Sequence, residues 1–173
     1  MSAGNWFRVA VVIFLALLVQ QALLVDITVA REHPDIMFLL PVAAGYVGGP
    51  GRGTVIGFLS GLAADLLLPT TFGMSALVGA LVAYGVGVAT LSLVRSSPAL
   101  QVVTGAVGTA AGMCLYAILG AILGSPNMLK VNLVPALVVA TPAAAILAVP
   151  VMYLMRWAVK SRSTTDRVSA TSW

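Results

Sequence analysis

Charged side chains are scarce in this sequence of 173 residues. Asp, Glu, Lys and Arg make up 8% of it and 60% of its residues are hydrophobic, whereas a typical soluble domain is about 25% charged. Between Ile36 and Met155 the formal charges are confined to Arg52, Asp65, Arg95 and Lys130. A soluble fold of this size needs far more polar surface than that. The composition therefore excludes a soluble enzyme, a nucleic-acid-binding domain and a disordered chain, and it indicates an integral membrane protein.

Cysteine and histidine are almost absent. Cys114 and His33 each stand alone, so the sequence offers no intrachain disulfide and no metal-ligand spacing. It also has no pair of acids within the apolar segments and no Ser–His or Ser–Lys pair at membrane depth. The glycine-rich stretch from Gly48 to Gly53 lacks the Gly-Lys-Ser/Thr ending of a P-loop, and it predicts a tight cytoplasmic turn. We therefore expect no enzymatic activity, no metal and no cofactor.

Long apolar segments are what the sequence has instead. A helix that crosses a bilayer core of ~30 Å needs about 20 apolar residues. We predict six such spans, at 6–25, 36–47, 54–68, 72–94, 99–124 and 131–157. The second and third are short, and each could be a tilted or partly re-entrant helix. The predicted fold is an all-α, polytopic membrane helical bundle that forms one domain over residues 1–158.

The two ends of the chain fit this arrangement. The first span is better explained as an uncleaved signal anchor than as a signal peptide, because the stretch from Val25 to Arg31 offers a poor cleavage site and more spans follow. Residues 159–173 are rich in Ser and Thr, and we expect them to form a disordered cytoplasmic tail.

Basic residues predict the orientation of the six spans. Arginine and lysine are enriched on the cytoplasmic side of membrane proteins. A cytoplasmic amino terminus leaves only Arg31 and Lys130 outside, and it places the other basic residues inside: Arg8, Arg52, Arg95, Arg156, Lys160, Arg162 and Arg167. Both termini are therefore predicted to be cytoplasmic. The net charge of +4 is then explained by contact with anionic membrane lipids rather than with nucleic acid.

Aromatic side chains predict where the interfaces lie. Tyr46 and Trp157 fall at the ends of predicted spans, where amphipathic aromatic rings normally sit at the headgroup level. We expect both rings at the membrane–water interface.

The third span carries an ordered pattern, with Gly57, Gly61 and Asp65 four residues apart on one helix face. Small residues at this spacing let a second helix backbone approach closely. The pattern predicts a packing seam, either with another helix of the same chain or with the helix of a partner.

Asp65 is the only acid within a predicted span, and placing it in the membrane is costly. One explanation is structural: its carboxylate accepts hydrogen bonds from the start of the next helix, near Thr70 to Phe72, where the helix dipole also favours an anion. A contact with a partner subunit and a proton or ion relay are the other two possibilities. A relay normally needs a second titratable group at membrane depth, and none is evident.

The last span contains Pro135, Pro142 and Pro150. Each proline removes a backbone donor and clashes with the preceding turn, so this helix should kink or break. Few polar residues accompany the prolines, which favours a role in shape rather than in chemistry.

The third and fourth spans resemble a known family. They read GFLSGLAADLL from Gly57 to Leu67, FGMSAL from Phe72 to Leu77, and AYGVG from Ala83 to Gly87. This is similar to the MreD family of rod shape-determining membrane proteins, in which a G-F-x-x-G-L-x-x-D-L motif precedes a short turn, then L/F-G-x-x-A-L and a G-Y or A-Y pair with a nearby glycine. The resemblance implies Gly57, Gly61, Asp65, Gly73 and Tyr84 as structural or partner-interface residues.

The same resemblance implies a function and a fold. MreD-like proteins are non-enzymatic scaffolds of bacterial cell elongation in the cytoplasmic (inner) membrane. They work with the bitopic protein MreC, a RodA-like SEDS glycosyltransferase and a class B penicillin-binding protein in peptidoglycan synthesis. Their bundle is related to the S components of energy-coupling-factor transporters. A substrate-binding subunit of a vitamin transporter is therefore the alternative, although few polar residues are available to line its pocket.

Overall fold

The computed structural model describes residues 3–19, 37–67, 73–91, 97–123 and 133–159. These residues form five helices and, within those ranges, no strand. The helices are α1 (Ala3–Val19), α2 (Leu39–Leu67), α3 (Met74–Ala89), α4 (Pro98–Ile122) and α5 (Leu133–Val159). The all-α prediction is confirmed. Of the predicted tail over residues 159–173, only Val159 is described, as the last residue of α5. His33 also lies outside the described residues.

The second and third predicted spans are the two halves of α2. A single non-helical residue, Gly49, separates them, with φ 72° and ψ −177°. This conformation is open to glycine and strained for other residues. Pro50 then starts the second half, where a missing amide donor costs nothing. The turn predicted over Gly48 to Gly53 is therefore wrong in extent, because one residue of positive φ is enough to redirect the helix.

The halves of α2 lie against each other close to this kink. A Cβ added to Gly53 would come within 2.6 Å of the Gly45 Cα atom, although a straight helix would hold these two residues about 12 Å apart. The first half, up to Gly48, is about 15 Å long at 1.5 Å per residue, which is roughly half of a bilayer core.

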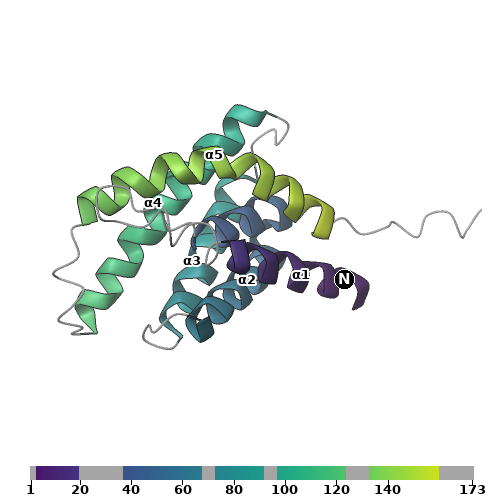
Figure 1. Cartoon of the computed structure of the whole chain (residues 1–173), viewed down its shortest axis with the longest axis horizontal. Helices are drawn as coiled ribbons and strands as arrows, with labels where there is room; N and C mark the ends of the chain where they lie inside the picture. Colours follow the sequence, from purple (N-terminus) through teal and green to yellow (C-terminus); the bar gives the residue numbers. More distant parts are fainter. Residues whose placement is uncertain (1–2, 20–36, 68–72, 92–96, 124–132, 160–173) are drawn as a thin grey trace, which may run out of the picture.

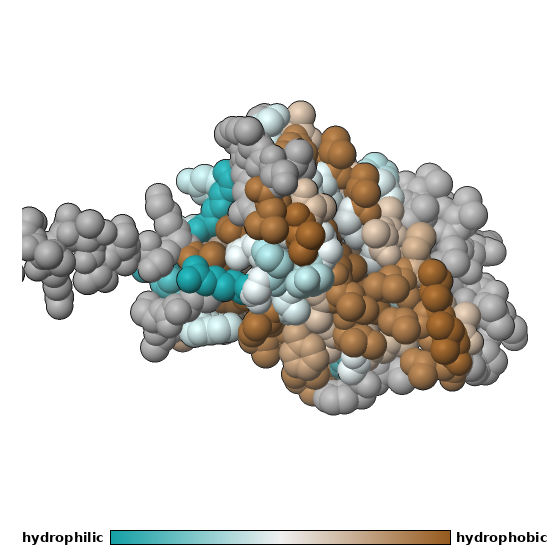
Figure 2. All heavy atoms as spheres, turned by 180° about the vertical axis from the view of Figure 1, so that it is seen from behind, coloured by the Kyte–Doolittle hydropathy of each residue, from teal (hydrophilic) through white to brown (hydrophobic). Residues whose placement is uncertain are grey.

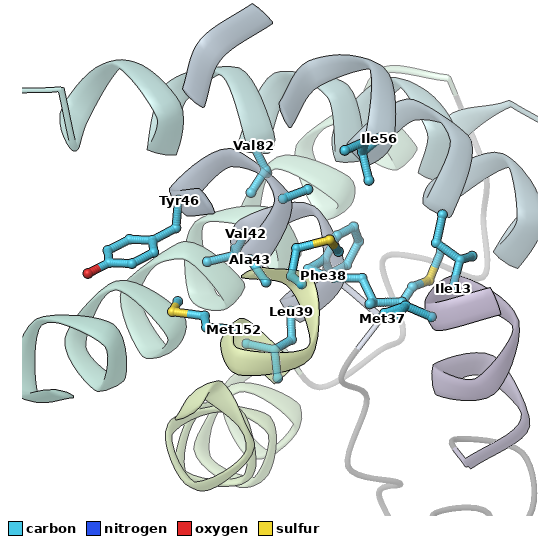
Figure 3. Packing of buried hydrophobic residues seen from close by; sticks show 14 of the residues in the cluster. Ile13, Met37, Phe38, Leu39, Val42, Ala43, Tyr46, Ile56, Val82 and Met152 are labelled. Carbon is cyan, nitrogen blue, oxygen red and sulfur yellow. The ribbon is translucent and has the colours of Figure 1, made fainter. Parts of the chain in front are cut away.

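The first half of α2 also forms the centre of the bundle. Its residues from Leu39 to Tyr46 are all buried, and α2 contacts each of the other four helices. Figure 3 shows its side chains Leu39, Val42 and Tyr46 in one cluster with residues of α1, α3 and α5, namely Ile13, Val82 and Met152. Tyr46 is fully buried, so its ring packs inside the protein, under α5, and not on the lipid-facing surface that an interfacial aromatic ring normally occupies. Trp157 is exposed, as expected of an interfacial residue.

The helix α5 lies across α4, α2 and α1 (Figure 1). It continues through both Pro142 and Pro150 and bends along its length (Figure 1). The predicted kink is thus present as a bend, and the predicted break is not. On its inner side α4 brings glycines to this core, where Gly108 faces Val42 and Gly112 faces Phe38.

The outer surface is apolar over most of the face in Figure 2, and hydrophilic residues gather toward one end. Two stretches of helix, Ala99–Ile122 and Ala140–Val159, are long and apolar enough to cross a membrane. Shorter apolar helices are Asn5–Leu18 and Met74–Ala89. Phe7, Ile122, Ile146 and Tyr153 are among the most exposed large side chains, which is an arrangement suited to lipid rather than water.

Candidate functional site: the α2–α3 seam

The glycines of the motif lie where α2 and α3 touch. A Cβ added to Gly57 would lie 2.6 Å from both the Gly79 carbonyl oxygen and the Ala83 Cβ atom. At Gly61 an added Cβ would collide with the carbonyl oxygen of Ser75 and lie 2.7 Å from the Ala76 Cα atom. No side chain fits between these backbones. Of the two alternatives for this helix face, the structure shows packing within the chain, because α3 already fills the groove.

Asp65 closes the same seam at its far end. Its side chain is 4% exposed. Its Oδ2 atom accepts hydrogen bonds from the backbone amides of Gly73, at 2.9 Å, and Ala76, at 3.2 Å, while Oδ1 accepts one from the amide of Ser75 at 3.3 Å. These amides belong to the first turn of α3, whose donors have no partner within the helix. The carboxylate therefore caps α3 from another helix. Its negative charge also interacts favourably with the positive end of the α3 dipole.

Gly73 is the residue that allows this cap. It precedes α3 with φ 89° and has no side chain of its own to cap the helix. A left-handed conformation favours glycine, and it turns the Gly73 amide toward the Asp65 carboxylate. The hydrogen bonds expected from the sequence are thus present, but the helix that receives the cap starts at Met74 rather than at Phe72.

Tyr84 lies apart from the other four motif residues. Its side chain is 54% exposed and it shares an exposed face of α3 with Leu77, Leu81 and Val88. Gly85 is on the same face, and no atom comes within 4 Å of a Cβ added there. The structure therefore joins Gly57, Gly61, Asp65 and Gly73 in one seam and leaves Tyr84 on the opposite, outward side of α3.

Sequence reasoning missed the second half of this seam. On α3, Ser75, Gly79, Ala83 and Gly87 recur every four residues and face α2, with Gly87 against Pro50. Their spacing matches that of Gly57 and Gly61 and could have been read as a complementary face. The pattern does not stand out in the sequence, because alanine and serine are common in the apolar segments of this chain.

The chemistry open to the seam is limited. Within the described ranges no three His, Cys, Asp or Glu residues come together as a possible metal site, and Asp65 is the only acid there. Both oxygens of its carboxylate already accept backbone amides. The geometry is that of a structural clamp between two helices.

This clamp is built from the residues on which the resemblance to rod shape-determining proteins rests. The sequence model of the family described as rod shape-determining protein MreD matches residues 2–158. The chain belongs to the MreD family. No curated protein and no solved structure matches it.

Membership in the MreD family implies a role in rod shape determination and a place in the membrane. The apolar surface and the two helices long enough to cross a bilayer agree with this. The family match also extends far beyond the α2–α3 seam, from the start of α1 to the end of α5.

Proposed function

We propose that this MreD-family protein is a non-enzymatic, multi-pass scaffold of the bacterial cell-elongation machinery. In this proposal both termini are cytoplasmic, and the two short halves of α2 provide the second and third of six spans, each as a tilted or partly re-entrant helix. The scaffold holds the transmembrane helix of an MreC-like bitopic protein and supports a RodA-like SEDS glycosyltransferase and its class B penicillin-binding protein. The relation to transporter S components stays a prediction.

One observation supports a scaffold above other functions. Gly57, Gly61, Asp65 and Gly73 are all used to fix α2 against α3. In an enzyme or a transporter, some of the residues of a family pattern are expected to line a pocket or contact a substrate. Here they make two helices into one rigid unit, and a rigid helical surface is what a partner helix needs for specific packing in lipid.

The outward face of this unit is the proposed docking surface. The exposed face of α3 presents Leu81, Tyr84 and Val88 beside the open position of Gly85. A glycine between larger side chains lets a partner backbone come close, and the Tyr84 hydroxyl can then hydrogen-bond across the interface. We propose that the single transmembrane helix of the MreC-like partner packs here.

The test is recovery of partners from the native membrane. The tagged chain is purified in mild detergent, and the co-purified proteins and small molecules are identified by mass spectrometry. We expect an MreC-like protein or cell-wall synthases to be recovered, and Tyr84→Ala to reduce that recovery. The matched control is Tyr153→Ala, which removes a tyrosine that is more exposed than Tyr84 from a different helix, α5, and should leave recovery unchanged.

Two results would overturn the proposal. Recovery of an energy-coupling ATPase module or a bound vitamin would favour the transporter alternative. Equal loss of the MreC-like partner with both tyrosine variants would show that the α3 face is not the docking surface.

A further inference from the structure

Two arginines at one end of the bundle are stacked on aromatic rings. The Arg8 guanidinium carbon lies 5.1 Å from the centroid of the Trp157 ring, which joins α1 to α5. The Arg156 guanidinium carbon lies 5.8 Å from the centroid of the Tyr46 ring, which joins α5 to α2. A cation over an aromatic face is attracted by the ring quadrupole. Each guanidinium is therefore attracted to one aromatic face, which favours this position over the other rotamers open to an arginine side chain.

Positive charge is concentrated at this end. The charged residues that the structure describes are Arg8, Arg52, Arg156 and Asp65. Arg52 belongs to the same end, because it lies six residues after Tyr46, just beyond the kink at Gly49. Asp65 is about 20 Å further along the second half of α2 at 1.5 Å per residue. Among the described residues, therefore, no carboxylate lies at the arginine-bearing end.

Trp157 is also one end of a row of exposed side chains on α5. Counting back along the helix from Trp157, the row continues with Tyr153, Val149 and Ile146, and Tyr153 is 74% and Ile146 76% exposed. We call this row the α5 stripe. From Trp157 to Ile146 the helix rises about 16 Å. One leaflet of a bilayer core is about 15 Å thick, so the stripe has the length of an acyl chain region, with the Arg8–Trp157 stack at its polar end.

We propose that the Arg8–Trp157 stack and this stripe of α5 form a binding site for one anionic phospholipid. A guanidinium stacked on its face keeps its edge N–H groups available, and these match the geometry of a phosphate group. The headgroup phosphate binds the edge of Arg8, and an acyl chain lies along Trp157, Tyr153 and Ile146. Anionic lipids are the fitting class, because the site is positively charged and the surface beside it is apolar over one leaflet.

The apolar row of side chains beside Arg8 favours a lipid as the occupant over a free anion or a peptide. A free phosphate would use the arginine edge alone and gain nothing from Tyr153 or Ile146. A peptide would not require an apolar surface of one leaflet's length. The site does not depend on the proposed partner surface, which lies on α3.

The first experiment measures lipids retained by the full chain. The protein is purified in mild detergent, incubated with phosphatidylglycerol or phosphatidylcholine, and examined by native mass spectrometry. We expect preferential retention of phosphatidylglycerol, and about a fivefold loss of that preference in Arg8→Gln, as for one basic group at a membrane surface. Trp157→Leu should give a similar loss because it releases Arg8.

The matched control is Arg52→Gln. Arg52 is exposed and carries the same charge at the same end, and no aromatic stack onto it is found among the described residues. The preference for phosphatidylglycerol should survive this change. An equal loss in Arg8→Gln and Arg52→Gln would overturn the proposal in favour of general charge attraction, and so would an unchanged preference in Arg8→Gln.

A second measurement tests by fluorescence whether the lipid lies next to Trp157, without changing Arg8 or Trp157 at first. The chain has three tryptophans, Trp6, Trp157 and Trp173, and replacing Trp6 and Trp173 by Phe leaves Trp157 as the reporter. Phosphatidylglycerol brominated on its acyl chains should quench Trp157 fluorescence more than brominated phosphatidylcholine does at equal content. Arg8→Gln should remove that difference. Equal quenching by the two lipids before any change at Arg8 would contradict the site.

Discussion

The Asp65 carboxylate accepts a hydrogen bond from the Gly73 amide over 2.9 Å and so ties the end of α2 to the start of α3. Eight residues separate the pair in sequence, and Gly73 reaches the carboxylate because its φ is 89°. The cost of placing an acid within an apolar segment is offset by three amide donors, each of which would otherwise be unsatisfied.

Two replacements of Asp65 should therefore show how much its hydrogen bonds, rather than the size of its side chain, contribute to stability. Asn keeps one carbonyl oxygen and turns an NH₂ group toward amide donors, so Asp65→Asn should be partly destabilising. Asp65→Leu leaves all three amides unpaired, at about 1–3 kcal/mol for each buried group. Thermal unfolding in detergent should rank the wild type above Asn and Asn above Leu. If Leu were as stable as the wild type, the cap would contribute nothing.

Gly61→Ala should destabilise the protein by pushing two helices apart. The new Cβ would meet the Ser75 carbonyl and the Ala76 Cα atom, which are backbone atoms and cannot rotate away. Overpacking of this kind costs about 1–3 kcal/mol. The control is Gly85→Ala on the exposed face of α3, where the space is open and alanine gains about 0.5–1 kcal/mol over glycine in a helix. Opposite shifts in unfolding temperature are expected, and equal shifts would show that Gly61 is not in a tight seam.

Gly49→Ala should be destabilising for a different reason. Space is open at both Gly49 and Gly51, since no atom lies within 4 Å of an added Cβ. Only Gly49 has a positive φ, 72°, so the cost there is backbone strain of about 1–3 kcal/mol. Gly51→Ala, which is in regular helix, should be neutral or stabilising. The two variants compared by thermal unfolding measure the strain at the kink directly, and similar stabilities would argue against this backbone conformation.

Two buried threonines should respond differently to valine, which has nearly the same shape. The Thr90 hydroxyl donates to the Val86 carbonyl oxygen at 2.7 Å, whereas the Thr109 hydroxyl is buried and has no hydrogen-bond partner. Thr90→Val should cost about 0.6 kcal/mol, a typical value for a hydrogen bond within a membrane protein. Thr109→Val should be neutral or stabilising, because it removes an unsatisfied polar atom. Loss of stability in Thr109→Val alone would contradict this difference.

Several features were predictable from the sequence because they depend on local composition. The scarcity of charge predicted an all-α membrane protein, and the spacing of Gly57, Gly61 and Asp65 predicted a seam. The burial cost of Asp65 gave a helix cap as one of three explanations. The kink at Gly49 is predicted only as a tight turn over Gly48 to Gly53, because the sequence shows a cluster of four glycines and a proline but not which residue has positive φ. The burial of Tyr46 is not predictable from the sequence, because an aromatic ring near a helix end fits an interface and a core equally well.

The formation of apolar helices and the need to compensate the Asp65 carboxylate follow from the sequence, because hydropathy and the cost of burying a charge act on each segment alone. The choice of the α3 amides as its donors, the packing of α3 on the Gly57–Gly61 face, the outward position of Tyr84 and the meeting of Arg8 with Trp157 are properties of the tertiary structure. These contacts join residues far apart in the chain. They depend on how two backbones or side chains approach each other, which no single segment specifies.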